Sequence, residues 1–432
     1  MNPKNTDCMP SVFLQHHPAT SLRRFLPVLM LCALAQGCTR DVDMVALGVD
    51  DVYYIYRMTK LDLHPALTGA SYRWTEVLPD GTEETVSTDR DYIFLKGDEG
   101  TYTLRFDIID PDTPYSFTFD IHVLHEEVEY SPYISRVYEY CPAPGQFVNE
   151  MPRYEPGDTE ADMVRKAQES ISGKNDIMIS LGAYGGYVTF GFDHTVVNVP
   201  GEKDFRIWGN AFYELINPEE RGGSAEPGIV MVSYDVNCNG LPDDPWYELA
   251  GSEYNKPSYR RGYTVTYSRP DSGRPPVEDE SGYLDDIYYI PWTDSDGVTG
   301  YVAKNIFHNQ SYFPEWLGDS VTSLTFTGSC LPPNGTDLSG TGRYYVLYAY
   351  DYGYADNHPN EYEDLNSFDI GDAVDADGRP VDLPGADFVR VYTGLNQYCG
   401  WLGETSTEIS RAQDLHIQAG PVVPDDPIPT MN

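Results

Sequence analysis

Residues 235–244 are the stretch of the sequence in which side-chain chemistry and spacing agree best. The stretch reads Asp-Val-Asn-Cys-Asn-Gly-Leu-Pro-Asp-Asp, so oxygen-bearing side chains alternate before a glycine and two carboxylates follow. Loops of this kind wrap hard cations such as calcium. No helical pattern flanks the stretch and the closing glutamate of an EF-hand is missing, so the alternative is a solvated acidic hairpin. We predict a structural Ca2+ site with the ligands Asp235, Asn237, Asn239, Leu241, Asp243 and Asp244.

Aromatic residues interleaved with amides form a second chemical pattern. They gather in the runs 208–212, 307–316 and 350–357 and at the single Trp292. Flat rings beside amide and hydroxyl groups suit an amphipathic, hydrogen-bonding ligand such as a sugar or a corrinoid. For any one of these residues, packing in the core or in a turn is the competing interpretation. The predicted ligand contacts are Trp208, Trp292, His308, Gln310, Tyr312, Tyr352, Tyr354 and Asn357, with His308 as the candidate to reach a corrinoid cobalt.

Catalytic motifs are weak, and we predict that the chain is not an enzyme. The glycine-rich run 181–194 leads into neither a helix start nor a lysine, so it predicts a tight turn rather than a phosphate site. The sequence has no HExxH and no GxSxG, and His194, His308 and His358 lack metal-ligand spacing. A glycosidase carboxylate pair stays open as an alternative, because such partners need only meet in space.

Composition limits the partners. The 432 residues include 28 Lys and Arg against 68 Asp and Glu, a formal net charge of -40. Such a field repels nucleic acid and anionic membrane surfaces, so neither is expected as a partner. With 41% hydrophobic and 13% aromatic residues, the chain has enough apolar side chains for packed cores.

The N-terminal residues 1–38 predict export. Arg23 and Arg24 precede the apolar run 25–31, which is too short to span a bilayer, and small residues lead to Cys38. A cysteine at this place resembles a bacterial lipobox, which predicts lipidation of Cys38. An ordinary cleaved signal with an incidental cysteine is the alternative. No other segment has the ~20 apolar residues of a membrane helix.

The rest of the chain predicts an all-β protein with two domains. Residues 39–126 contain short alternating strands, turn residues and a single Trp74, which favours an immunoglobulin-like β-sandwich. Residues 127–417 predict many short strands in a jelly-roll-like domain with one helix, capped by Thr159 and Asp162 and ended by Gly173. Residues 418–432, rich in Pro and Asp, predict a disordered tail.

Four cysteines follow Cys38 in the sequence. They have no CxxC spacing, so zinc and redox chemistry are not expected, and a disulfide between two of them stays open. These residues are Cys141, Cys238, Cys330 and Cys399.

Several longer motifs resemble one family of bacterial surface proteins. They lie at residues 140–147, 181–194, 204–212, 226–228, 235–249, 353–357, 368–375, 387–391 and 400–404. With Tyr72-x-Trp74 and Gly100-x-Tyr102-x-Leu104 in the first domain, they resemble Bacteroidota "cell surface proteins" with a PKD-like N-terminal domain. The acidic stretch 39–43 looks like the sorting signals that send lipoproteins of that phylum to the outside of the outer membrane.

The resemblance implies a spacer role for the PKD-like domain and a ligand-binding role for the second domain. Similar lipoproteins belong to corrinoid-uptake loci, so it further implies capture of a cobamide (cobalamin) and delivery to an outer-membrane TonB-dependent transporter. A lipid-anchored protein that faces the cell exterior is therefore our leading hypothesis. A carbohydrate-binding or adhesion module of a glycan-utilisation system is the alternative, and a glycan hydrolase is the third possibility.

Overall fold

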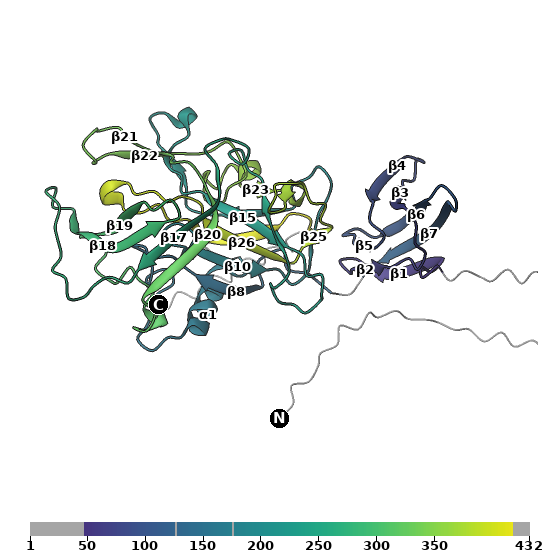
Figure 1. Cartoon of the computed structure of the whole chain (residues 1–432), viewed down its shortest axis with the longest axis horizontal. Coiled ribbons are helices and arrows are strands. Elements are labelled where there is room, and N and C mark those ends of the chain that lie inside the picture. The colour runs from purple at the N-terminus through teal and green to yellow at the C-terminus, as the bar shows by residue number, and fades with distance from the viewer. Residues whose placement is uncertain (1–46, 126–127, 175–176, 418–432) are drawn as a thin grey trace, which may run out of the picture. The chain divides into compact units, whose positions relative to one another are not determined.

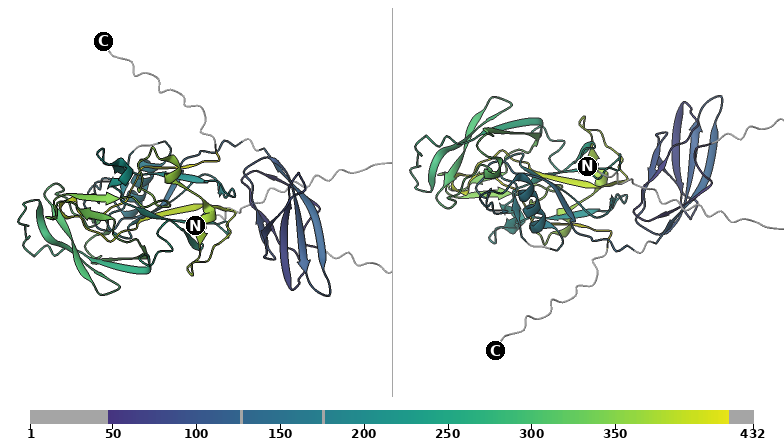
Figure 2. Two further views of the ribbon diagram at one scale, coloured as in Figure 1. Left: turned by 90° about the horizontal axis from the view of Figure 1, so that it is seen from above. Right: turned by 90° about the horizontal axis from the view of Figure 1, so that it is seen from below.

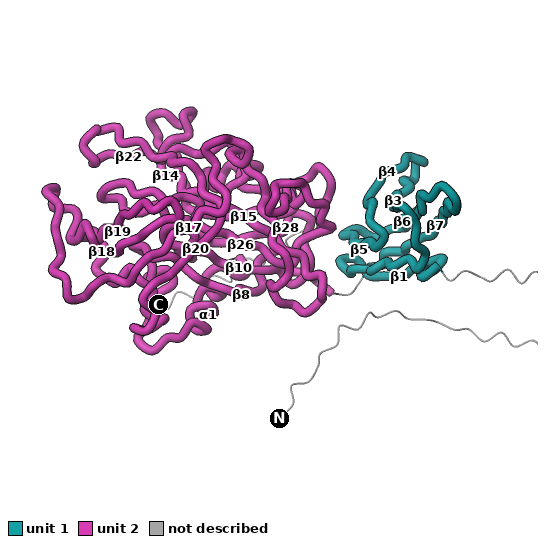
Figure 3. Tube along the Cα trace, in the orientation of Figure 1, with its two compact units in different colours: residues 1–127 teal, residues 128–432 magenta. Residues whose placement is uncertain are grey.

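The computed structural model describes residues 47–125, 128–174 and 177–417. The chain divides into two compact units, residues 1–127 and 128–432, drawn in teal and magenta in Figure 3. The predicted signal peptide with Cys38, the acidic stretch 39–43 and the predicted tail 418–432 lie outside the described residues. Within the described part, no helix is long and apolar enough to cross a membrane.

The described residues of the smaller unit, 47–125, form strands and no helix. A five-stranded sheet has the order β1-β7-β6-β3-β4, and β2 pairs with β5 in a second, two-stranded sheet. Figure 2 shows the longer strands running side by side. The bounds are β1 Val52–Tyr56, β2 Leu61–Leu63, β3 Ser71–Val77, β4 Glu83–Ser87, β5 Tyr92–Phe94, β6 Gly100–Ile109 and β7 Tyr115–Leu124.

The core of the smaller unit explains why these segments are strands. On β7, Phe119, Ile121 and Val123 alternate with more exposed residues and point to one face, as a strand period of two requires. Trp74 lies at the centre and is fully buried, and its indole N–H donates to the carbonyl of Asp89 at 3.1 Å. A large ring that is fully buried, and whose N–H group has a hydrogen-bond partner, is what the predicted β-sandwich core requires.

The larger unit contains the strands β8–β28 and the helix α1 (Figure 1). Its first half comprises β8 Arg136–Cys141, α1 Glu160–Ile171, β9 Ile179–Ser180, β10 Tyr187–Gly191, β11 Val196–Val197, β12 Phe205–Trp208, β13 Phe212–Tyr213, β14 Gly222–Ser224, β15 Gly228–Ser233, β16 Trp246–Leu249 and β17 Arg260–Ser268. The second half comprises β18 Leu284–Asp294, β19 Thr299–Asn305, β20 Ser323–Cys330, β21 Gly335–Asp337, β22 Tyr345–Tyr348, β23 Ser367–Phe368, β24 Ala373–Val374, β25 Gly385–Ala386, β26 Phe388–Thr393, β27 Glu408–Ile409 and β28 Arg411–Asp414.

A six-stranded sheet with the order β24-β16-β15-β26-β10-β8 forms the centre of this unit. All of its pairs are antiparallel, and Val391 on β26 lies between Val188 on β10 and Val230 on β15. Because β26 is covered on both faces, its sequence is a nearly continuous apolar run and does not alternate with polar residues.

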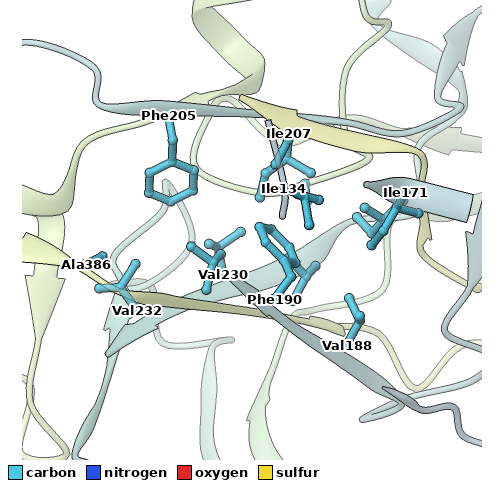
Figure 4. Close-up of a cluster of buried hydrophobic side chains, with 14 of the residues drawn as sticks. Ile134, Ile171, Val188, Phe190, Phe205, Ile207, Val230, Val232 and Ala386 are labelled. Atoms are coloured by element: carbon cyan, nitrogen blue, oxygen red, sulfur yellow. The ribbon is translucent and has the colours of Figure 1, made fainter. Parts of the chain in front are cut away.

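A smaller sheet, β23-β12-β28, covers one face of this centre. Figure 4 shows Phe205 and Ile207 of β12 pointing toward Val230 and Phe190 of the large sheet. All four side chains are fully buried. Sheet-on-sheet packing of this kind is the interior of a β-sandwich.

The single α-helix of the described residues also packs on this core. Thr159 and Asp162 form the predicted capping box, and Gly173 follows the helix with a positive φ of 66°. The side chains of Met163, Ala167 and Ile171 form the buried face of the helix.

The remaining sheets lie around the centre. The order β19-β18-β17-β20 forms a four-stranded sheet, whose green strands occupy one end of the larger unit in both views of Figure 2. Four short strands form β13-β14-β22-β21, and the pairs β11-β25 and β27-β9 complete the unit. The predicted all-β class is confirmed, and the strands are spread over more sheets than the two of a jelly roll. Within the described residues, no disulfide joins Cys141, Cys238, Cys330 or Cys399.

Candidate functional site

Two of the three sizeable cavities of the larger unit are candidate ligand sites; the third, of about 350 Å³, is lined by Arg269, Asp271, Arg274, Tyr288, Tyr289, Pro291 and Tyr301. The first, of about 460 Å³, lies between the six-stranded sheet and the β17–β20 sheet, with Tyr187, Trp246 and Phe326 in its walls. Its charged groups are already engaged: Arg390 pairs with Glu139 at 2.5 Å and lies over the ring of Trp246. Because the polar groups of this cavity satisfy one another, it is the weaker candidate for a ligand site.

The second cavity, of about 330 Å³, combines rings with unusually many carboxylates, and we name it the acid-floored cavity. Its lining residues are Gln146, Phe147, Asn210, Ser224, Glu226, Asn305, Phe307, His308, Leu347, Cys399, Trp401, Leu402, Gly403, Glu404, Thr405 and Glu408.

Segments far apart in the sequence supply its carboxylates. Glu226 lies two residues before β15, Glu408 begins β27, and Glu404 follows a single 3-10 turn at Gly400–Leu402. Gly403 has a φ of 91°, and a Cβ there would lie 2.9 Å from the side chain of Gln146. A glycine is therefore needed for the chain to turn Glu404 inward beside this side chain.

Burial sets the electrostatics of the floor. It raises the pKa of Glu226 to about 7 and that of Glu404 to about 8. Burial, with the charge of Glu226 as the next cause, also raises the pKa values of Asp356 and Glu408 well above their usual range. The floor thus holds carboxyl groups that retain protons at a pH where surface carboxyls have lost them.

Asp356 and Asn210 join this floor from neighbouring loops. The Asp356 carboxylate accepts from the backbone N–H groups of Asn210 at 2.7 Å, Ala211 at 2.8 Å and Glu408 at 3.0 Å. In the side-chain orientation that satisfies both groups, the NH2 group of Asn210 donates to the same carboxylate at 3.2 Å. These donors carry no positive charge, so they orient the Asp356 side chain but do not act as a counter-ion for it.

Three rings, which we name the aromatic rim, lie at the exposed side of the cavity. They are Tyr283, Phe307 and Trp401, whose ring centroids lie 6.0 to 6.3 Å apart. Phe307 is 53% exposed and Tyr283 is 42% exposed, so large ring surfaces face solvent. The indole N–H of Trp401 donates to the carbonyl of Arg343 at 3.0 Å, which orients the ring. Grouped exposed rings are typical of binding surfaces.

Two of the predicted ligand contacts lie at this cavity. His308 lines it, and its ring packs edge-on against Phe147 at 4.7 Å. Burial lowers the pKa of His308, so the imidazole is neutral at neutral pH. Gln310 is close by, because its side-chain amide donates to the backbone carbonyl of Gln146.

Both predicted tryptophans lie elsewhere. The ring of Trp208 is covered by the guanidinium groups of Arg206 at 4.1 Å and Arg411 at 4.5 Å, so its faces are already used. Trp292 lines a small separate cavity of about 40 Å³, which also has Glu404 in its wall.

Three further residues predicted as ligand contacts have buried side chains that bond to the protein's own backbone. Tyr312 is fully buried and its hydroxyl accepts from the N–H of Asn305 at 3.2 Å. Tyr354, 1% exposed, accepts from the N–H of Glu253 at 3.0 Å.

The third, Asn357, is fully buried and bonds both the N–H and the carbonyl of Tyr350 at 2.9 Å. It therefore closes the turn between them. Tyr352 is 51% exposed but lines none of the three sizeable cavities.

The predicted calcium loop connects β15 and β16 as a hairpin. Both carboxylate oxygens of Asp235 accept backbone N–H groups, from Asn239 at 3.1 Å and from Gly240 at 2.8 Å. The amides of Asn237 and Asn239 donate to Asp243 at 3.0 to 3.2 Å. The predicted oxygen-bearing side chains do converge on the turn at Gly240, and this chemistry fits a hard cation.

Comparisons with known proteins add little to this geometry. No family model matches the chain, and no curated protein matches it by sequence. A solved SusE-like protein shares 8% identity at a TM-score of 0.26, over 84% of this chain and 95% of that one. A structure titled for the promiscuous specificity of β-sandwich carbohydrate-binding modules shares 11% identity at a TM-score of 0.14, over 83% and 91%. These TM-scores are too low to carry an argument, so the fold class rests on the strands themselves.

The residues that sequence reasoning missed are the buried acids. Glu226, Asp356, Glu404 and Glu408 are separated by up to 182 positions, and no spacing links them. Three of them lie in motifs that carry the family resemblance, at residues 226–228, 353–357 and 400–404. Those motifs were the only sequence feature that singled out these acids, and nothing in the motifs indicated that the acids share a cavity.

Proposed function

We propose that the chain is a ligand-capture protein of the cell surface whose acid-floored cavity binds a carbohydrate. The aromatic rim beside the acidic floor is the observation that carries this proposal. A sugar ring has an apolar C–H face that packs on an aromatic ring and hydroxyl groups that donate to carboxylates and amides. A volume of about 330 Å³ also suits a small ligand, since ligand cavities span roughly 300–1,000 Å³.

A cobamide is the second candidate, and His308 is the observation that favours it. A neutral imidazole is the form that coordinates transition metals, and His308 lines the cavity in that form. A corrin ring with its amide side chains is larger than a sugar unit. In this alternative it rests on the aromatic rim, where the amides reach the floor and His308 meets the cobalt.

The remaining parts of the proposal concern location and partners. A lipid on Cys38 anchors the protein in the outer membrane so that it faces the cell exterior, and the smaller unit acts as a spacer. A TonB-dependent transporter receives the captured ligand. The net charge of -40 keeps the protein off anionic lipid, so the anchor is its only membrane contact.

Binding rather than catalysis is part of the same proposal. A retaining glycosidase needs two carboxyl groups about 5 Å apart on either side of a bond. Glu226 and Glu408 each place a carboxylate oxygen within 4.8 Å of the other, but Glu408 is only 2% exposed. Such a side chain lies too deep to flank a glycosidic bond.

Glycan-array screening of the purified protein, followed by calorimetry with the best hit, tests the proposal. We expect Trp401→Ala to weaken binding at least tenfold, about 1.4 kcal/mol, because the ring loses its contact with the sugar face. Tyr352→Ala is the matched control, since this exposed ring lines neither cavity, and it leaves affinity unchanged.

Three outcomes count against parts of the proposal. Retention of cyanocobalamin on a desalting column, with no array hit, favours the cobamide. Cleavage of a bound glycan makes the chain an enzyme. Equal effects of the Trp401 and Tyr352 substitutions place the ligand elsewhere.

A further inference from the structure

Three carboxylates from three separate segments meet below the acid-floored cavity. Glu226 precedes β15, Asp356 lies in the loop after β22, and Glu408 begins β27. One oxygen of each lies within 4.8 Å of one oxygen of each of the others. Asp356 is fully buried and Glu408 is 2% exposed. Three carboxyl groups this close and this far from water cannot all be charged unless a cation lies among them; without a cation they keep protons.

The contacts of the three carboxylates come from neutral groups. Besides the backbone donors to Asp356, Glu226 accepts from the N–H of Ser406 at 3.2 Å, and Glu408 accepts from the Ser406 hydroxyl at 2.8 Å. Within the described residues, none of the three forms an ion pair with a Lys or Arg. These donors orient the oxygens but supply no positive charge.

Glu404 provides an independent observation in the same cavity. It is 4% exposed, and it lines the same cavity as Glu226 and Glu408. Its Oε1 accepts from the N–H of Gln146 at 2.5 Å, whereas its Oε2 has no hydrogen-bond partner among the described residues. A buried carboxylate oxygen without a partner is rare in folded proteins, and a bound ion or water is one arrangement that would satisfy it.

We propose that Glu226, Asp356 and Glu408 form a binding site for a divalent cation of the calcium class, with Glu404 on its cavity side. All the ligand atoms are carboxylate oxygens, which hard cations prefer. Calcium binds oxygens at about 2.3–2.6 Å, so ligands on opposite sides of one ion can lie up to about 5 Å apart. One ion can therefore contact all three oxygens at the separations found here.

The site differs from the loop at residues 235–244 and does not depend on the identity of the captured ligand. Magnesium fits less well, because its bonds of about 2.0–2.1 Å require oxygens in a nearly ideal octahedron. Zinc prefers nitrogen and sulfur ligands, and the cluster offers neither. The side toward Glu404 leaves coordination positions for water or for an oxygen of a bound ligand.

Calcium titration of the chelator-treated protein by calorimetry tests the proposal. We expect wild-type protein to bind calcium at this cluster, and Glu408→Gln to weaken that binding at least tenfold while keeping the size of the side chain. Asp243→Asn is the matched control: it alters the hairpin loop and leaves the cluster's binding in place. Circular dichroism and melting of each variant establish that it is folded.

A second variant keeps the test decisive where Glu408→Gln fails to fold. Glu404→Gln lies at the cavity side and also weakens calcium binding, because it replaces the unpartnered oxygen with a neutral amide group. Absence of calcium binding by folded wild-type protein overturns the proposal. Binding that survives both glutamine variants and disappears in Asp243→Asn assigns the ion to the hairpin loop and likewise overturns it. Glycan binding, measured separately, distinguishes failure of this site from failure of the capture function.

Discussion

Replacement of His194 by alanine should destabilise the larger unit strongly at pH 6 and much less at pH 9. The ring is almost fully buried, and its two nitrogens lie 2.8 Å from Asp193 and 2.7 Å from Asp414. Burial alone would lower the pKa of His194, but hydrogen bonds with Asp414 and Asp193 outweigh it, so the pKa is raised. The imidazolium is thus held between two carboxylates, of which Asp414 is fully buried.

The size and sign of the effect follow from this geometry. Removing His194 at pH 6 leaves the Asp414 charge buried without its cation, which costs about 3–5 kcal/mol. Asp193 is 40% exposed, so its pairing adds little. Because the folded-state pKa is raised, the stabilisation is fully present below the unfolded pKa of about 6.5 and is lost as the pH rises through the folded value. At pH 9 we expect about 1 kcal/mol, the contribution of a neutral hydrogen bond.

Urea unfolding followed by tryptophan fluorescence measures this effect, since five of the six tryptophans belong to the larger unit. His125→Ala is the control, because His125 contacts Glu99 at 2.9 Å but is well exposed. Its loss should cost no more than about 1 kcal/mol. A cost below about 1 kcal/mol for His194→Ala at pH 6, or equal costs at pH 6 and pH 9, refutes the reasoning.

Three further predictions concern buried side chains. Asn357→Ala breaks both bonds to Tyr350 and should lower the free energy of unfolding by about 2 kcal/mol, measured in urea, without loss of the array hit in folded protein. Burial lowers the pKa of His358 to about 4, so wild-type protein should lose about 3 kcal/mol relative to His358→Gln as the pH falls from 6.5 to 4; parallel pH profiles of the two proteins contradict this. Phe190→Ala should cost about 3–5 kcal/mol by leaving a void in the central core, while Tyr352→Ala, at the surface, should cost less than about 0.5 kcal/mol.

Local features of the fold could be predicted from the sequence because their causes are local. The helix start at Thr159 depends on Asp162 three residues later, and both lie within one turn. The strands of the smaller unit show their alternation directly, as β7 does. The pairing of β10 with β8 joins residues about 50 positions apart, and its pairing with β26 joins residues about 200 positions apart, so no local pattern encodes either pairing.

The candidate site was predictable only in part, for a physical reason. Aromatic and amide residues in long loops either face a ligand or hold the loop, and their types are the same in both cases. His308 faces the cavity, whereas Asn357 uses its whole amide to close a turn. Tyr312 lies beside Phe313, and both side chains are fully buried. The neighbouring Phe313 therefore indicated a core position for Tyr312 and not a binding face.

The proposed cation and the proposed carbohydrate use the same carboxylates of the cavity floor. The binding of one should therefore change the affinity for the other, and this change can be measured. Without an ion, Glu226, the least buried of the three, offers an acceptor or a shared proton to a ligand's hydroxyl groups. With a calcium ion bound, the same floor presents open coordination positions on the ion, which take up the oxygens of those hydroxyls.

Ligand affinity should therefore change between calcium and chelator, and the affinity for calcium must change by the same factor when ligand is present, because coupling between two sites is reciprocal. We expect calcium to tighten ligand binding at least fivefold, about 1 kcal/mol, since the ion supplies open coordination positions beside the aromatic rim. If calcium binds the cluster but the two affinities are independent, the ion has a structural role only, and the ligand makes its contacts through the rings and amides.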